Sequence, residues 1–150
     1  MIPTVRRATL DDLDRLASLF DAYRQFYEQP SDLNRARQFL GDRLARNESV
    51  VLIAEVQAGV TVGFVQLYRT FSSIGTAPMY VFNDLYVVLE ARRRGIGTFL
   101  LKSAAETARA AGAVRLKLAT AITNVPAQRV YEALGWKRDE EFYVYSLSLS

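Results

Sequence analysis

The chain has 150 residues, with 19 basic and 16 acidic side chains and a formal net charge of +3 at pH 7. It contains neither cysteine nor histidine, which excludes disulfides, thiolate catalysis and the side chain that most often serves as general base or metal ligand. No stretch has the apolar length of a membrane span or of a signal peptide. These totals predict one cytoplasmic domain over residues 1–150 that uses no metal and does not act on a membrane.

Hydrophobic periodicity divides the first half of the chain into strands and helices. Thr9 followed by Asp12 is typical of a helix start, because a hydroxyl cap precedes acids in the first turn. The pair Ala58-Gly59 lies between two β-branched runs and predicts a hairpin. The elements expected here are a strand at residues 2–8, helices at about residues 12–27 and 33–44, two strands within residues 49–69, and a loop at residues 71–77.

The second half contains one strand–helix–strand crossover. Its elements are a strand at residues 77–88, a helix from about residue 95 to Gly112, a strand at residues 114–119, a short helix between Asn124 and Gly135, and a last strand at residues 142–150. The order β-α-α-β-β-β-α-β-α-β predicts an α/β (mixed α+β) fold, with helices flanking a mixed sheet.

The segment ARRRGIG, residues 91–97, concentrates positive charge where the helix dipole is already positive. Glycines let backbone N–H groups approach a ligand, and the N–H groups at a helix start bind anions. A phosphorylated ligand explains both features, and a solvated basic turn is the alternative. The sequence lacks the Walker pattern, and its glycine spacing does not fit a dinucleotide fingerprint.

Two motifs carry a family resemblance. Arg92, Gly95 and Gly97 form R-x-x-G-x-G after NDLYVV, and the segment NVPAQRVYEALGW follows at residues 124–136. With the order of elements, they resemble the acetyl-CoA site of the GCN5-related N-acetyltransferase (GNAT) superfamily. The resemblance implies an acyltransferase with acetyl-CoA as co-substrate and a mostly antiparallel sheet of about six or seven strands flanked by four helices. The stretch at residues 71–87 also resembles the polyamine, D-amino-acid and small-amine branch.

The resemblance implies particular coenzyme contacts. Residues 92–98 would cradle the pyrophosphate, mainly through the backbone N–H groups of Arg93, Arg94, Gly95, Gly97 and Thr98. The strand before them would bind the pantetheine arm and polarise the thioester carbonyl. Ordinary sheet pairing is the alternative for that strand. The implied contacts are Leu85, Tyr86, Val87, Arg92, Arg93, Arg94, Gly95, Ile96, Gly97, Thr98, Asn124, Ala127, Gln128 and Tyr131.

Two side chains are candidates for proton transfer. Simple alternation predicts that Asp84 shares a face with Tyr80, Phe82 and Tyr86, and burial among aromatic rings suits a general base or an anchor for an amine. A structural brace at a bulge is the alternative for Asp84. The resemblance implies that Tyr131 protonates the departing thiolate, whereas helical spacing also allows a packing role.

The acceptor side of the predicted site is less defined. The resemblance implies that the first helix pair and the loop before the central strand flank the acceptor groove, so the candidate substrate contacts are Tyr27, Glu28, Ser72 and Ser73, with Asp84. Aromatic rings and carboxylates suit a cationic amine, and packing against Tyr23 is the alternative for Tyr27. The sequence therefore predicts transfer of an acetyl group to a primary amine of a small molecule, in a ternary complex.

The same residues are compatible with other functions and partners. The alternatives are a protein N-terminal or lysine acetyltransferase and a non-catalytic acyl-CoA-binding module. Nucleic-acid binding is disfavoured, because the basic residues alternate with acidic ones. The alternating tail at residues 142–150 allows pairing across a homodimer.

Overall fold

The structure is a computed structural model that describes residues 2–57 and 59–150. Its packing divides the chain into two compact units, one ending at Leu118 and the other Ala119–Ser150. Within the described residues, the first unit holds a five-stranded sheet in the order β1-β2-β3-β4-β5, antiparallel except for the last pair. The strands are β1 (Thr4–Arg7), β2 (Ser49–Gln57), β3 (Val60–Ser72), β4 (Ala77–Val87) and β5 (Leu116–Lys117). The mixed α/β class is confirmed, and the number of strands is lower than expected.

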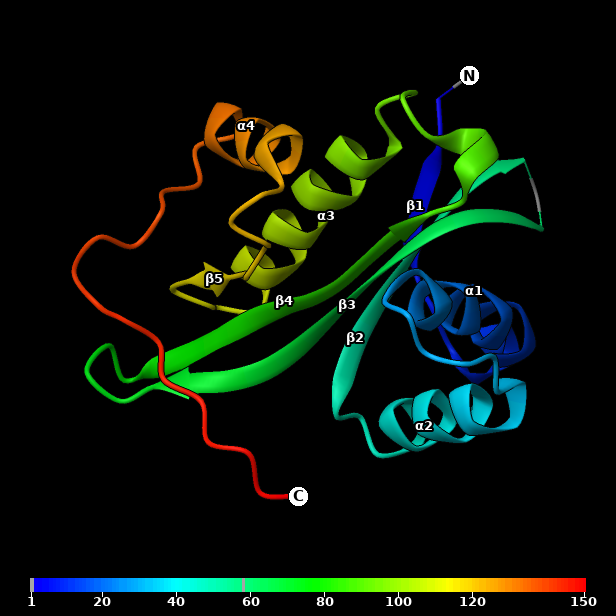
Figure 1. Ribbon diagram of the computed structural model, residues 1–150, viewed down its shortest axis with the longest axis horizontal. Helices are drawn as coiled ribbons and strands as arrows, with labels where there is room; N and C mark the ends of the chain where they lie inside the picture. The colour runs from blue at the N-terminus through cyan, green and yellow to red at the C-terminus, as the bar shows by residue number, and fades with distance from the viewer. Residues whose placement is uncertain (1, 58) are drawn as a thin grey trace. The chain divides into compact units, whose positions relative to one another are not determined.

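Helices α1 (Leu13–Phe26) and α2 (Leu33–Ala45) cover one face of this sheet, and α3 (Ile96–Ala110) covers the other (Figure 1). Leu16, Leu40 and Phe64 are almost fully buried in the core cluster under α1 and α2. Each such side chain contributes roughly 1.5–3 kcal/mol by leaving water. The two predicted helices of the first half and the crossover helix are therefore confirmed.

The start of α1 is confirmed in detail. Thr9 forms a capping box with Asp12, in which the Thr9 backbone N–H donates to Asp12 Oδ2 at 2.8 Å. The helix is preceded by one 3₁₀ turn, Leu10–Asp12. A hydroxyl followed by an acid at this spacing satisfies backbone N–H groups that a helix start leaves without acceptors.

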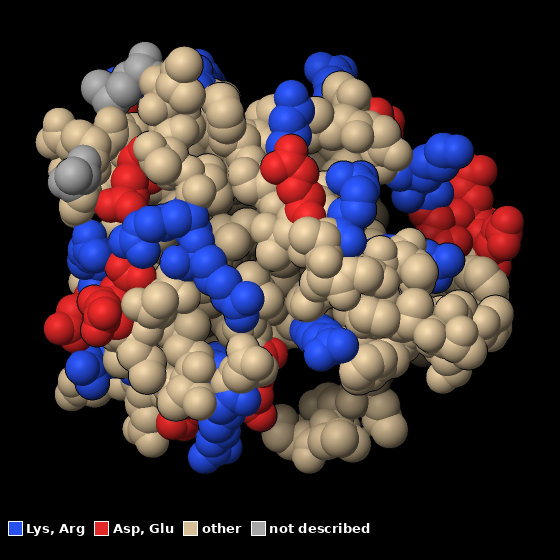
Figure 2. Space-filling model, turned by 180° about the vertical axis from the view of Figure 1, so that it is seen from behind, with Lys and Arg blue, Asp and Glu red and all other residues tan. Residues whose placement is uncertain are grey.

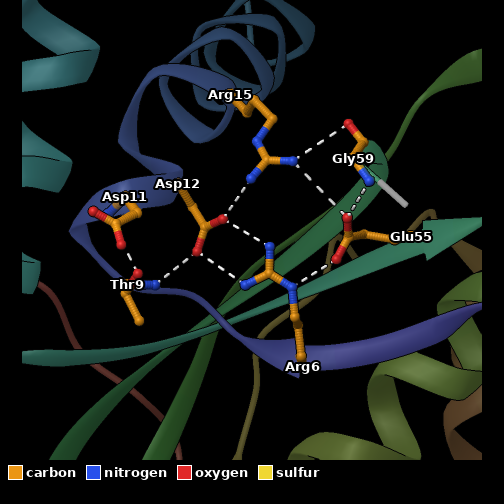
Figure 3. A network of polar contacts seen from close by, with 7 residues as sticks. All are labelled: Arg6, Thr9, Asp11, Asp12, Arg15, Glu55 and Gly59. Atoms are coloured by element: carbon orange, nitrogen blue, oxygen red, sulfur yellow. Dashed lines mark hydrogen bonds and ion pairs between the residues drawn. The ribbon is translucent and has the colours of Figure 1, made fainter. Parts of the chain in front are cut away.

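Asp12 is also the centre of a charged network (Figure 3). Its side chain is buried, and it accepts hydrogen bonds from Arg6 at 2.7 and 3.1 Å and from Arg15 at 2.8 Å. Arg6 also donates to Glu55 at 2.6 Å, and Glu55 accepts from the N–H of Gly59. The network therefore ties β1 to the start of α1 and to the β2–β3 hairpin.

We expect Asp12→Asn to lower the free energy of unfolding by about 3 kcal/mol, since it leaves buried polar groups without their charged partner. The hydrogen bond from Arg6 lowers the pKa of Asp12, and the same guanidinium lowers that of Glu55. A carboxylate with a lowered folded-state pKa stabilises fully above its unfolded pKa, near 4, and loses this effect as the pH falls through the folded value. Urea unfolding between pH 7 and pH 3 should show a steep acid loss in the wild type and a shallower one in the variant.

Asp14 offers the matched control for this prediction. It pairs with Arg37 at 2.8 Å, but its side chain is 84% exposed. Exposed pairs contribute at most about 1 kcal/mol, so Asp14→Asn should unfold almost like the wild type at every pH. Equal destabilisation by the two substitutions would contradict a special role for the Asp12 network.

Several predicted boundaries are wrong. Residues 71 and 72 continue β3, and residue 77 begins β4, so the expected loop shrinks to a turn at residues 73–76. Strand β5 has two residues in place of the six expected at 114–119. The β2–β3 hairpin is confirmed by its pairing, although Ala58 of the predicted turn lies outside the described residues.

The second unit contains α4 (Val125–Ala133), whose start is confirmed, since Asn124 Oδ1 accepts from the N–H of Ala127 at 3.3 Å. The predicted last strand is wrong, because residues 142–150 pair with no strand of the described chain. Tyr143, Tyr145 and Leu147 are each more than 80% exposed. A strand needs a partner for its backbone groups, and pairing of this tail across a homodimer stays a prediction. The single-domain organisation also stays a prediction.

None of the helices in the described residues combines the length and apolar content needed to cross a bilayer. The cytoplasmic location stays a prediction.

Candidate acetyl-coenzyme A site

The segment between β4 and α3, residues 92–98, has an unusual backbone, and we call it the Arg–Gly loop. Arg93 and Gly95 have φ angles of 63° and 78°, in the left-handed region. Left-handed residues in a turn can direct successive N–H groups into one concavity. Helix α3 begins after Gly95 without a side-chain cap, so its first N–H groups have no acceptor within the helix.

The loop also leaves room for a ligand. A Cβ built on Gly95 or on Gly97 meets no heavy atom within 4 Å beyond its chain neighbours and its own helix backbone. Ile96, between them, is buried and holds the helix start against the core. Free donors, open space and a positive helix end together fit a phosphate group.

The arginines of the loop have different surroundings. Arg92 Nε donates to the carbonyl oxygen of Val87 at 2.8 Å, and its guanidinium lies 5.5 Å from the ring centroids of both Phe26 and Tyr86. Arg92 therefore braces the end of β4 against α1. The side chains of Arg93 and Arg94 are exposed. These two guanidinium groups therefore face solvent, unlike that of Arg92, and are free to reach a phosphate.

Strand β4 has an open edge just before the Arg–Gly loop. On one side it pairs with β3 as far as Val87, but on the other it pairs with β5 only at Tyr80 and Val81. In the described part of the chain, the backbone of Leu85 and Tyr86 therefore has no strand partner on this second side. Such an edge can pair with an extended ligand, as the predicted pantetheine contacts require.

The side-chain direction expected for Asp84 is wrong. Gln66 and Leu67 are neighbours in β3, yet they pair with Asp84 and Phe82, so β4 carries a bulge at Asn83. Directly paired residues share a face and neighbours face opposite sides. Asp84 therefore shares a face with Gln66 and not with Phe82. The bulge inserts one residue, which reverses the alternation.

The same register places the other aromatic residues of β4. Tyr86 pairs with Phe64, two residues from Gln66, and so lies on the Asp84 face. Tyr80 pairs with Arg69 and lies on the opposite face. Of the three aromatic neighbours expected for Asp84, only Tyr86 is on its side.

Asp84 is buried in a polar cluster. Its exposure is 4%, and it accepts hydrogen bonds from Gln66 Nε2 to Oδ2 at 2.5 Å and from Asn83 Nδ2 to Oδ1 at 2.9 Å. Burial, the charge of Asp84 and a hydrogen bond to it raise the pKa of Tyr23 far above its usual range. Burial and then the same charge raise the pKa of Tyr68 to about 12, against the opposing effect of Arg43. Both tyrosines therefore remain phenols at neutral pH.

The predicted acceptor contacts fall into two groups. Tyr27 at the end of α1 stacks edge-on against Tyr23 at 5.0 Å between centroids, and Glu28 follows it with a φ of 65°. Tyr23 links this group to Asp84. Ser72 lies six residues along β3 from Gln66, or roughly 20 Å at the usual rise per residue, and its Oγ accepts from the N–H of Gly75. The structure therefore does not bring Ser72 and the adjacent Ser73 to Asp84.

The remaining candidates belong to the second unit. Tyr131 is half-buried and lies 6.1 Å from Trp136, ring centroid to ring centroid. Gln128 Nε2 donates to the carbonyl oxygens of Ala121 and Ile122 at 3.2 and 3.1 Å, so its amide holds the loop before α4. Ala127 uses its N–H in the Asn124 cap. Nothing within this unit excludes the coenzyme contacts assigned to Asn124, Ala127, Gln128 and Tyr131.

Sequence reasoning missed Gln66 and Tyr68, which surround Asp84, and the inward direction of Arg92. A glutamine inside an apolar strand is the one signal that was visible: VTVGFVQLY places Gln66 among residues that are buried. Among the described residues, no group of three or more acidic, histidine or cysteine side chains could hold a metal ion.

Surface charge on one face of the molecule is mixed. Figure 2 shows Lys and Arg side chains scattered among Asp and Glu side chains, without one continuous basic stripe on that face. Nucleic-acid binding generally requires clustered positive charge. A nucleic-acid partner therefore remains the less favoured hypothesis.

Comparison with known proteins decides the family. The model of the acetyltransferase (GNAT) family matches residues 13–136. The chain belongs to the GNAT family. It is 44% identical over 145 residues to the uncharacterized N-acetyltransferase YhfO of Bacillus subtilis (strain 168), covering 97% of each chain.

Further matches to this GNAT protein extend the likeness. A crystal structure of a probable acetyltransferase superposes with a TM-score of 0.93 at 42% identity, covering 98% of each chain. The aminoglycoside N(6')-acetyltransferase type 1 of Klebsiella aerogenes is 33% identical over 101 residues, 66% of each chain. The predicted fold and the acyltransferase class are thus confirmed, and GNAT acetyltransferases use acetyl-CoA as co-substrate.

Proposed function

We propose that this GNAT protein transfers the acetyl group of acetyl-CoA to a primary amine of a small molecule, directly and within a ternary complex. The observation that carries the proposal is the uncapped, left-handed Arg–Gly loop next to the open edge of β4. The open edge of β4 and the phosphate donors of the loop are adjacent along the chain. The pantetheine arm and the pyrophosphate are likewise adjacent in coenzyme A.

The residues take defined roles in this proposal. Bound acetyl-CoA supplies the thioester. The pyrophosphate is held mainly by the N–H groups of Arg93, Arg94, Gly95, Gly97 and Thr98, whereas the Arg92 N–H donates to the carbonyl oxygen of Leu89 at 3.3 Å. The backbone of residues 85–87 holds the arm and polarises the carbonyl oxygen. Asp84 receives the acceptor amine and takes its proton, directly or through water. The amine nitrogen bonds to the carbonyl carbon as the carbon–sulfur bond breaks, and Tyr131 gives a proton to the sulfur. The second proton lost by the nitrogen restores the Tyr131 phenol through water.

A small cationic amine is the favoured acceptor class. Asp84, Tyr23 and Tyr68 place a carboxylate among aromatic rings, which suits an ammonium group. The Klebsiella aerogenes relative is named for aminoglycosides, which are polycationic amines of this kind. Polyamines and basic amino acids belong to the same class, and protein N-termini and lysine side chains are the alternatives.

Release of free thiol from acetyl-CoA tests the proposal. We expect amine-dependent release with at least one member of a panel of polyamines, aminoglycosides, amino acids and short peptides. Mass spectrometry of the acceptor should show one added acetyl group. Tight coenzyme binding without release above the hydrolysis background for any acceptor would favour the non-catalytic module instead, and no binding at all would overturn both.

A further inference from the structure

Gln66 is the most enclosed polar side chain next to the proposed site. Its exposure is 0%, and it lies in the middle of β3, directly opposite Asp84 in β4. Its Nε2 donates to Asp84 Oδ2 at 2.5 Å, and the side chain also hydrogen-bonds Tyr68. The nitrogen end of this amide is therefore fully engaged with the cluster around Asp84.

The oxygen end is not engaged. In the part of the chain that the structure describes, Gln66 Oε1 is buried and has no hydrogen-bond partner. An unpaired buried acceptor destabilises the fold. An apolar side chain of similar length, such as methionine, would have no such unpaired oxygen at this position. The hydrogen bond from Gln66 Nε2 to Asp84 therefore explains an amide at this position better than packing does.

We propose that Gln66 is a positioning residue that, with Asn83, fixes the carboxylate of Asp84 to receive a cationic amine. The proposal rests on the proposed function and deepens it by naming the residues that orient the carboxylate toward the cationic amine. Gln66 binds one carboxylate oxygen and Asn83 the other, so the plane of the carboxylate is set from two sides. A carboxylate has about four acceptor positions, so positions remain for the N–H groups of an ammonium.

Charged and titratable groups reach this carboxylate from every neighbouring element. Tyr23 comes from α1 and Tyr68 from β3, both as phenols, while Tyr86 follows on the same face of β4. Arg43 of α2 acts on Tyr68. Loss of the Gln66 donor therefore leaves the plane of the Asp84 carboxylate held by Asn83 alone.

The test compares Gln66→Met with the wild type, and uses Thr61→Val as the matched control. Thr61 lies in the same strand and also carries a buried, unpartnered oxygen, but it pairs with Glu55 and not with Asp84. Carbon NMR of the Asp84 carboxyl, assigned with Asp84→Asn, gives the change in its signal when spermidine is added. Steady-state kinetics give KM for the best cationic acceptor, and calorimetry gives Kd for acetyl-CoA.

In Gln66→Met we expect KM for the cationic amine to rise about 10-fold, because Asn83 alone then holds the carboxylate that receives it. The Kd for acetyl-CoA should stay unchanged, and Thr61→Val should change none of these values. An unchanged KM for the amine, or an equal response of the Asp84 carboxyl signal to spermidine in the two proteins, would overturn the positioning role.

The NMR readout separates this proposal from the proposed function. If the wild type transfers no acetyl group, the proposed function fails, but titration with spermidine still shows whether an amine shifts the Asp84 carboxyl signal and whether Gln66→Met weakens that response. An amine response of equal strength in both proteins, or none in the wild type, would refute the positioning role in that case.

Discussion

Gly97→Asp is expected to reduce acetyl-CoA affinity at least about 100-fold, or roughly 2.7 kcal/mol, while leaving the fold intact. Beyond its chain neighbours and its own helix backbone, a Cβ at Gly97 meets no heavy atom within 4 Å, so the new side chain has room. An acid in the first turn of a helix favours the helix, because the dipole is positive there. The same charge repels a phosphate held by the Arg–Gly loop, by up to about 4 kcal/mol at 4 Å in a surface environment. Calorimetry with acetyl-CoA measures the loss.

Gly97→Asn and Gly97→Ala separate charge from shape in this prediction. Asparagine matches aspartate in size without its charge, and alanine adds only the Cβ, so both should bind acetyl-CoA far better than the aspartate variant. All three should unfold at or above the wild-type temperature, since each replaces glycine within a helix. Equal affinity of the aspartate and asparagine variants would show that no phosphate lies at this loop.

Much of the fold followed from local signals in the sequence. Strand β2 is β-branched and buried along most of its length, and the Thr9–Asp12 and Asn124 caps satisfy backbone groups in the way their chemistry predicts. Such signals depend on neighbours a few residues away. Their effect is therefore independent of how distant parts of the chain pack.

The direction of Asp84 needed information that no local pattern holds. One extra residue in β4 at Asn83 moves Phe82 to the face opposite Asp84 and brings Gln66 to its side. A bulge depends on how two strands pair, and that pairing is settled by the packing of the whole sheet. Alternation of side chains holds for a regular strand, and the bulge makes it wrong at Asp84, the candidate general base.

The Arg–Gly loop shows the opposite case. Two glycines after a strand and before a helix predicted a turn with exposed N–H groups, and the uncapped start of α3 agrees with that prediction. The three arginines looked equivalent in the sequence, yet Arg92 turns to Val87 and the aromatic rings of Phe26 and Tyr86. Backbone conformation follows from residue type here, whereas the path of a long side chain follows from its distant neighbours.

The last prediction concerns Tyr131, whose acid role rests on the family resemblance. We expect Tyr131→Phe to lower kcat about 100-fold, since general acid–base groups contribute about 10²–10⁴-fold. The substitution removes only the hydroxyl, so the ring keeps its place 6.1 Å from Trp136. The Kd for acetyl-CoA should change by less than about 3-fold, which is under 1 kcal/mol. Pre-steady-state kinetics and calorimetry measure the two quantities separately.

Tyr143→Phe and Tyr145→Phe are matched controls for this substitution, because both tyrosines lie in the same unit and are 92% and 90% exposed. Each loses the same hydroxyl from a ring that is almost fully exposed, so neither should change kcat. A Tyr131 variant with wild-type kcat would remove the residue from the acid role. A variant whose acetyl-CoA affinity falls in parallel with kcat would assign the hydroxyl to coenzyme binding, because loss of a proton donor acts on the transition state alone.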